Sequence, residues 1–429
     1  MVGFFGDFNK GESTMTYLER FDAAPEAERF ALVRGWLDHE ALPFVNELRE
    51  KRPILETSVC TLVADFNDVI EVLRLHEVFS VKPYGPKMTP YLMSVDDTPM
   101  HFRDKSAMSA FLDRADLPRI RALVAQETKA ALDAAGGQIE VISGLTRHIP
   151  IRVVESYFGL TDAPAGKLAE WSYWNQYDAF HNHPWDIVAD RQVVLDNVTR
   201  CKNEIVKYLA MLVAGREAKI LAMLPVPDDI VTRVMRTHIQ TPGQYGLQWK
   251  ALNLGGLLIG TVETSSQATS QALAQLMNRP RFLASAQASA QSDDPAEFDG
   301  YVWEALRFDP ISPYLFRMTE SPYTLGAGQP WQKQIAPGTA VLPLILAAMH
   351  DPVRFPNPGD FDPTRTTSNT FHFGYGLHEC MGRYVGGVII PEIIRQVLLR
   401  SDLKVIEPLS FMGKPFPERF VIGWNAASR

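Results

Sequence analysis

The pattern of apolar and polar positions along the chain predicts a mainly helical protein with a small β portion. Apolar residues recur at the helical spacing of three and four positions over several long segments. These predicted helices cover residues 27–52, 68–76, 117–134, 138–158, 168–185 and 383–399. Shorter runs of apolar and β-branched residues predict strands at 60–66 and 339–345, and residues 404–424 are expected to form β structure with turns.

A further predicted helix, over residues 247–278, is apolar or neutral on nearly every face. Between Lys250 and Arg279 its only charged residue is Glu263, and a helix of this kind is expected to be buried. Its serine, threonine and glutamine residues argue against a membrane span. A lone carboxylate in a buried helix is costly unless it is paired or functional. Glu263 and its neighbour Thr264 are therefore candidate site residues.

Composition narrows the possible classes of protein. The 429 residues are 46% hydrophobic and carry a formal net charge of −8, with acids and bases interspersed, which argues against generic nucleic-acid binding. No linker, repeat or low-complexity run divides the chain. The three cysteines are isolated in sequence, which fits a reducing cytoplasm. Residues 1–21 contain no apolar run near the ~20 residues that span a bilayer, so no membrane anchor is predicted.

Residues 373–382, Phe-Gly-Tyr-Gly-Leu-His-Glu-Cys-Met-Gly, carry the clearest candidate chemistry. The three glycines permit a tight backbone that could aim amide N–H groups at the sulfur of Cys380. The predicted helix that follows would place this sulfur just before a helix N-terminus. Amide donors and the helix dipole both favour a thiolate over a thiol.

Three interpretations of Cys380 remain open from the residues alone. A lone cysteine after glycines is usually a small buried hydrophobic residue. A zinc site that includes His378 is disfavoured, because Cys60 and Cys201 are isolated and structural zinc takes four ligands. An iron with one axial thiolate, as in some haem proteins, needs only this cysteine.

The spacing Phe-Gly-x-Gly-x-His-x-Cys-x-Gly over residues 373–382 resembles the haem-binding signature of the cytochromes P450. The resemblance implies a cytochrome P450 fold, mainly α, in which residues 1–429 form one haem domain with a long central helix over the haem. It also implies haem b as the cofactor. Cys380 would be the iron ligand, with Phe373 and His378 beside the cofactor.

Three further motifs match the family in the expected order. In the first, residues 97–101 open a predicted helix on which His101 and Lys105 share a face at i, i+4. The resemblance implies that His101, Lys105 and, later in the chain, Arg317 bind haem propionates. The family has Arg where this chain has Lys105, which supplies a charge without a bidentate fork. The alternative is a solvated helix start without a ligand.

The second motif lies in the central helix, where residues 260–264, Gly-Thr-Val-Glu-Thr, resemble the family's Gly-x-x-acid-Thr pattern. Gly260 would leave room on the helix wall next to the cofactor. Thr264 can open the helix by hydrogen bonding to the preceding turn. The resemblance implies that Glu263 and Thr264 relay protons to dioxygen. Thr261 and Glu263 depart from the commoner Gly or Ala and Asp.

The third motif is the pair Glu304 and Arg307. An acid and a base at this spacing are common on helix surfaces and contribute little stability alone. The pair resembles the family's structural Glu-x-x-Arg, whose later partner is here Arg365.

Several apolar segments are predicted to line a substrate pocket, although core packing alone explains most such residues. The loop 80–94 is unusually apolar, the stretch 168–185 is dense in aromatic residues, and the segment after Pro310 passes near the expected haem. In the family, helices near 168–185 form a mobile lid over the pocket. The predicted lining residues are Tyr84, Leu92, Tyr177, Phe180, Leu257, Ile311, Phe411 and Met412.

The resemblance implies a monooxygenase that inserts one atom of dioxygen into a hydrophobic organic compound. Electrons would come from NAD(P)H through a ferredoxin reductase and a ferredoxin, because the chain has no flavin domain and no cysteine cluster for iron and sulfur. We expect a cytoplasmic monomer. A peroxide-driven peroxygenase and a haem-based gas sensor or carrier remain alternatives, and the Glu263-Thr264 pair disfavours both.

A basic surface is predicted on the sulfur side of the haem, where electrons would enter. Although the whole chain is acidic, the segments expected there carry several arginines, which as a group would attract an acidic ferredoxin. For any single one, an ordinary solvated side chain is the simpler interpretation. These residues are Arg103, Arg114, Arg119, Arg121 and Arg383.

Overall fold

The computed structural model describes residues 15–88, 90–241, 243–292 and 294–426, and it is mainly helical, as predicted. The α-helices are α1 (Tyr17–Ala23), α2 (Glu26–His39), α3 (Ala41–Lys51), α4 (Phe66–Arg74), α5 (Gly85–Met88), α6 (Pro99–Phe111), α7 (Leu117–Ala135), α8 (His148–Val153), α9 (Lys167–His181), α10 (Arg191–Leu221), α11 (Ile230–Gln240), α12 (Leu247–Met277), α13 (Pro280–Ser289), α14 (Pro295–Phe308), α15 (Ile345–Ala348) and α16 (Arg383–Leu398). Among these helices, α12 is buried along most of its length.

The strands form small sheets. They are β1 (Ile54–Glu56), β2 (Thr61–Val63), β3 (Phe79–Ser80), β4 (Gln138–Glu140), β5 (Arg317–Thr319), β6 (Tyr323–Leu325), β7 (Lys333–Ile335), β8 (Ala340–Pro343), β9 (Lys404–Ser410) and β10 (Arg419–Gly423). One sheet has the order β1-β2-β8-β5-β3, with β2 and β8 parallel and its other pairs antiparallel. A second has the order β4-β10-β9, and β6 pairs with β7.

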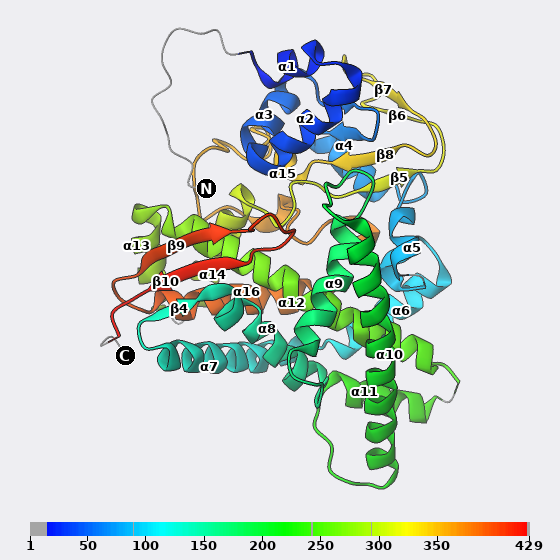
Figure 1. Cartoon of the computed structure of the whole chain (residues 1–429), viewed down its shortest axis with the longest axis vertical. Coiled ribbons are helices and arrows are strands. Elements are labelled where there is room, and N and C mark those ends of the chain that lie inside the picture. The colour runs from blue at the N-terminus through cyan, green and yellow to red at the C-terminus, as the bar shows by residue number, and fades with distance from the viewer. Residues whose placement is uncertain (1–14, 89, 242, 293, 427–429) are drawn as a thin grey trace.

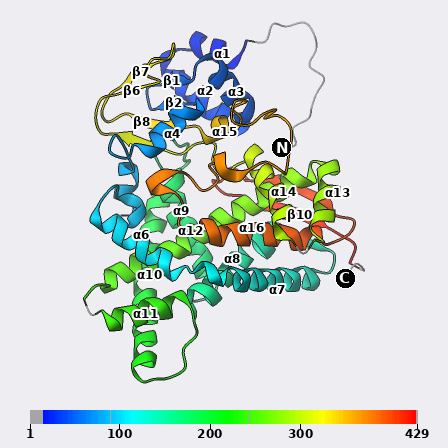
Figure 2. The same ribbon diagram turned by 180° about the vertical axis from the view of Figure 1, so that it is seen from behind.

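Helix α12 runs through the middle of the helical part of the molecule (Figure 1). The five-stranded sheet lies with α1, α2 and α3 at one end, and α10 and α11 lie at the other. From behind, α6, α7 and α16 are seen on the opposite face (Figure 2). The apolar residues of α12 contribute to two large core clusters, which explains why its sequence lacks a polar face.

Three predicted element boundaries are wrong for local reasons. The segment 27–52 forms α2 and α3 and breaks at Glu40, because Pro43 has no amide to continue the helix ladder. Helix α4 begins at Phe66, two residues before the predicted start at 68, because Asp65 caps it by accepting from the amides of Asn67 and Asp68. The segment 138–158 begins as strand β4 and contains π-helical turns on both sides of α8.

In the part of the chain that the structure describes, no helix is both long enough and apolar enough to cross a lipid bilayer. The prediction for the segment 1–21 rests largely on residues 1–14, which lie outside that part.

Candidate active site

The loop that carries Cys380 is tightly wound. Gly374 and Gly376 both have φ +73°, a conformation that side chains with a Cβ rarely adopt. A Cβ on Gly376 would also come within 3.1 Å of the carbonyl oxygen of Leu73. The Cys380 amide donates to the Phe373 carbonyl at 2.8 Å, which closes the loop. The backbone conformation thus requires glycine at positions 374 and 376.

The side chain of Cys380 is exposed, although many protein atoms lie around its thiol. Burial raises the pKa of the thiol, while a hydrogen bond from the Gly382 amide and the charge of Lys105 lower it. The expected amide donor is therefore present. By contrast Cys60 and Cys201 are buried, and their thiol pKa values rise to about 12 and about 11.

Lys105 binds the backbone of this loop. Its Nζ donates to the carbonyl of Leu377 and, at 3.0 Å, to the carbonyl of Glu379. The ammonium was expected on a haem propionate; in this structure it holds the residues on either side of His378. Burial lowers the pKa of Lys105, and the neighbouring Glu379 and Cys380 raise it.

Three buried side chains gather unpartnered nitrogens next to the loop. Nε2 of His101, Nε of Arg317 and Nδ1 of His378 have no hydrogen-bond partner. The two imidazole rings are 5.2 Å apart between centroids, and the charge of Arg317 acts on His378. His378 Nε2 also contacts Asp96 at 2.9 Å. A carboxylate among these groups would accept from the guanidinium and favour the charged imidazoles.

Helix α12 has an open turn at Gly260. Gly260 is exposed in the middle of a buried helix, and a Cβ placed on it would meet nothing within 4 Å. The Thr264 hydroxyl donates to the Gly260 carbonyl at 2.6 Å. One turn earlier, the ring of Tyr91 reaches the helix where Gly256 has no side chain. The charge of Cys380 contributes to raising the pKa of Tyr91, after burial, so Tyr91 lies near Cys380 as well as α12.

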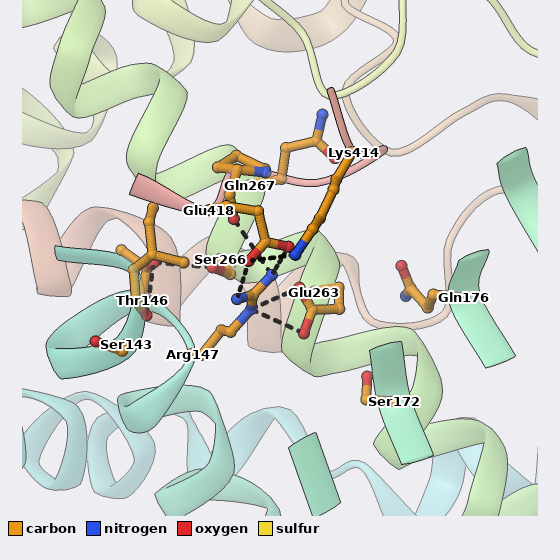
Figure 3. A network of polar contacts seen from close by, with 12 residues as sticks. Ser143, Thr146, Arg147, Ser172, Gln176, Glu263, Ser266, Gln267, Lys414 and Glu418 are labelled. Carbon is orange, nitrogen blue, oxygen red and sulfur yellow. Dashed lines mark hydrogen bonds and ion pairs between the residues drawn. The ribbon is translucent and has the colours of Figure 1, made fainter. Parts of the chain in front are cut away.

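Glu263 is buried and paired. Both of its oxygens accept from Nε of Arg147, at 3.1 and 2.9 Å, and the other nitrogens of Arg147 bind Glu418 (Figure 3). Burial raises the pKa of Glu263 to about 7, Arg147 lowers it, and Glu418 raises it again. Arg147 and Glu418 were not predicted as site residues. The sequence signal was slight, since Arg147 is the single Arg, Lys, Asp or Glu residue in the segment 142–151.

The predicted pocket residues fall into separate groups. Leu92 and Leu257 belong to one buried cluster, while Tyr84 packs on Phe316 at 4.6 Å and on Phe180 at 5.5 Å in another. Tyr177 stacks on Trp174. The remaining members are Ile311 and Phe411, which are half-buried, and Met412, which is exposed.

Helix α9 is held against α12 beside the open turn. Ser172 donates to the carbonyl of Leu258 at 3.4 Å, and Gln176 donates to the carbonyl of Ile259. Figure 3 shows these two side chains on α9. Sequence reasoning singled out the aromatic residues of this helix and missed these polar contacts.

The structural motif has the predicted partners. Glu304 binds Arg307 at 2.7 Å and Arg365 at 3.3 Å. Phe373 of the Cys380 loop packs on Trp303, which lies on α14 beside Glu304, with 5.5 Å between the ring centroids. These contacts connect α14 to the Cys380 loop.

The residues present fit a haem. Cys380 has an amide donor, α12 has an open turn at Gly260, and three cationic or imidazole side chains near the Cys380 loop each keep one unpartnered nitrogen that could bind a carboxylate. The geometry defines the class of a haem-thiolate protein.

Comparison with known proteins agrees. Residues 296–418 match the family profile described as Cytochrome P450. The erythromycin C-12 hydroxylase of Saccharopolyspora erythraea is 27% identical over 378 residues, which cover 84% of this chain and 88% of that protein. The monooxygenase PikC of Streptomyces venezuelae is 25% identical over 332 residues, which cover 76% of this chain and 73% of that protein. The structure of cytochrome P450 CYP109Q5 from Chondromyces apiculatus shares the fold, with a TM-score of 0.75 and 20% identity over 92% of this chain and 97% of that one.

The chain thus resembles the cytochromes P450 in sequence, with the profile match over residues 296–418, and it shares their fold over most of its length.

Proposed function

We propose that the chain is a monooxygenase that inserts one atom of dioxygen into a hydrophobic organic substrate and releases the other as water. The observations that carry this proposal are the exposed Cys380 side chain with its amide donor and the open turn of α12 at Gly260 and Thr264. Several relatives carry hydroxylase or epoxidase names, which supports the same type of reaction. Residues 1–429 would act as one haem domain in the cytoplasm.

The side chains have distinct proposed roles. Cys380 holds the iron of haem b, and His101, Arg317 and His378 bind its propionates. Haem supplies the iron centre at which dioxygen is activated. Lys105 fixes the Cys380 loop through its two carbonyl contacts. Gly260 leaves the space that dioxygen needs.

Thr264 and Glu263 are proposed to deliver protons to that space. The Thr264 hydroxyl lies in the open turn, where its hydrogen bond to the Gly260 carbonyl fixes its direction. Glu263 has a pKa of about 7, so it can both hold and release a proton near neutral pH. It is buried against Arg147, so a water molecule is needed between the carboxyl and Thr264.

Three incubations test the class of reaction. Substrate oxidation is compared with reduced ferredoxin and reductase, with hydrogen peroxide alone, and with neither. A monooxygenase forms product with the redox proteins and dioxygen. Product with peroxide alone at an equal or higher rate would identify a peroxygenase, and ligand binding without product in all three would identify a sensor or carrier.

A ferredoxin and its NAD(P)H-dependent reductase are the proposed partners of a monomeric enzyme. The basic surface predicted on the sulfur side carries less free positive charge than expected. Most of the arginines there are neutralised by carboxylates. The pairs are Arg103 with Asp104, Arg119 with Asp116 and Asp228, Arg121 with Asp299 and Glu392, and Arg383 with Glu379. Arg114 instead lies 3.7 Å above the ring of Tyr384. It is the best candidate for a contact with an acidic partner.

A further inference from the structure

Arg147 occupies a position between two elements that are far apart in sequence. It follows a π-helical turn at residues 142–146, and its guanidinium points between Glu263 of α12 and Glu418 at the start of β10 (Figure 3). Every nitrogen is used. Nε binds Glu263, Nη1 binds Glu418 at 3.3 Å, and Nη2 binds Glu418 at 3.2 Å and the Pro417 carbonyl at 3.2 Å.

The backbone around Arg147 is fixed to α12. The preceding residue, Thr146, shares a hydrogen bond of 2.8 Å with Ser266, one turn along from Glu263. The ring of Tyr173 from α9 lies 5.5 Å from the guanidinium carbon. The arginine therefore has little freedom to follow one acid away from the other.

The buried charges in this cluster do not balance. Two carboxylates share one buried guanidinium, and the side chains of Glu263, Glu418 and Arg147 are 1%, 15% and 18% exposed. The second cation of the cluster, Lys414, is 56% exposed and therefore compensates little of the buried charge. The charged or titratable groups that face them are Tyr173 and, from the solvent edge, Lys414, whose Nζ is 4.0 Å from Glu418. Because buried charge of one sign is costly, the cluster favours the uptake of one proton.

We propose that Glu418 competes with Glu263 for Arg147 and thereby sets how readily Glu263 gives up its proton. In this arrangement Arg147 and Glu418 are positioning residues, and neither reaches the space beside Gly260. The inference rests on the proposed role of Glu263 in proton delivery. It assigns the last hairpin of the chain, β9 and β10, a part in that step.

The test titrates the resting holoenzyme without turnover. Infrared difference spectra are recorded against pH, and the band that Glu263→Gln removes reports the protonation of Glu263. Glu418→Gln should lower the midpoint of this band by about one pH unit, a tenfold loss of proton affinity, because Arg147 then serves one acid. Arg147→Gln should raise it. An unchanged midpoint in Glu418→Gln overturns the proposal.

Matched variants exclude a general effect of disturbing the hairpin. Glu407→Gln removes an exposed partner of Arg419 in the same hairpin and should leave the midpoint in place. Glu418→Asp keeps the charge but draws it back from Arg147, so it should give a smaller shift than Glu418→Gln. A shift in Glu407→Gln equal to that in Glu418→Gln would overturn the assignment to Glu418.

Product formed per NAD(P)H consumed, measured against pH, separates this inference from the proposed function. If the proton-delivery role holds, its midpoint moves with the infrared midpoint. If the infrared midpoint shifts and the product ratio does not, the competition for Arg147 stands and the role of Glu263 in proton delivery is wrong.

Discussion

The loop around Cys380 and the helix turn around Glu263 each bury an acidic group, and they surround it by different means. The sulfur side, residues 373–382 with Lys105, uses a backbone amide and a lysine that holds backbone carbonyls. The acid side, Glu263 with Arg147 and Glu418, uses side chains from three separate segments. A backbone donor remains after most substitutions, whereas a side-chain partner is lost with one. The acid side should therefore be easier to tune by mutation.

The largest effect is expected from replacing Cys380 on the sulfur side. Cys380→His should abolish the thiolate-type spectrum of the reduced carbon monoxide complex and with it turnover, because no other thiol is exposed. Cys60→Ser and Cys201→Ser serve as controls and should keep the spectrum, since both sulfurs are buried elsewhere. Retention of the thiolate spectrum in Cys380→His would refute the assignment.

On the acid side, Thr264→Ala should lower product formed per NAD(P)H by about 100-fold, the lower end of the usual range for losing a proton-transfer group. Substrate binding and cofactor consumption should persist, with peroxide or water as the product of the diverted electrons. Thr269→Ala is the matched control, because its buried hydroxyl has no partner to lose. Equal product ratios in the two variants would count against Thr264.

The raised pKa of Glu263 predicts a pH dependence of stability. Its ordinary value is 4.5 and its value in the fold is about 7, so the folded state holds the proton more tightly. Stability is therefore fully present below pH 4.5 and falls as pH rises through 7. The free energy of unfolding should decrease by on the order of 2 kcal/mol more in wild type than in Glu263→Gln across this interval. Chemical denaturation at several pH values measures the difference, and identical slopes would contradict it.

Lys105 tests whether the sulfur side depends on a side chain after all. Lys105→Met should leave two carbonyls without a charged donor and should speed transfer of haem to an acceptor protein by about 5- to 30-fold, equivalent to about 1–2 kcal/mol. Lys105→Arg can restore one carbonyl contact, so its rate of haem transfer should lie between those of wild type and Lys105→Met. If Lys105→Met transfers haem at the wild-type rate, then the loop is held by its own backbone alone.

The smallest effect concerns the outer surface of the sulfur side. Arg114→Glu should slow reduction by the ferredoxin a few-fold at low salt, and the difference should shrink as exposed charges are screened over roughly 10 Å at 0.1 M. Arg119→Glu should have less effect, since Arg119 already pairs with Asp116 and Asp228. If the rate of reduction depends neither on salt nor on these charge reversals, the ferredoxin docks elsewhere on the surface.

The same contrast separates what could be predicted from the sequence from what could not. The Cys380 loop is contiguous, so the spacing of its glycines is sufficient to indicate its shape. Helix α12 was predicted because burial on all sides leaves a plain compositional pattern. The partner of Glu263 was not, because Arg147 and Glu418 lie 116 and 155 positions away on either side, counted along the chain. The π-helical turn before Arg147, which directs its side chain, has no comparable sequence signal.

The pocket shows the same limit on a larger scale. Tyr84 and Leu92 are eight positions apart and were predicted to line one surface, yet they pack into different clusters. Short helical turns between them redirect the chain. Apolar character identified these residues as buried, and only the tertiary packing decides what each one faces.

The late position of the last hairpin has a consequence for biosynthesis. Arg147 contacts Glu418 across 271 positions, and the Phe420 amide reaches Glu140 across 280. A ribosome releases residues 147 and 263 well before residue 418, so the nascent chain offers Arg147 a single acid first. Glu263 can thus be neutralised while the helical body assembles. Glu418 reaches Arg147 only when β10 pairs with β4. The Arg147–Glu418 contact, which weakens the hold of Arg147 on Glu263, is therefore among the last contacts that can form during translation.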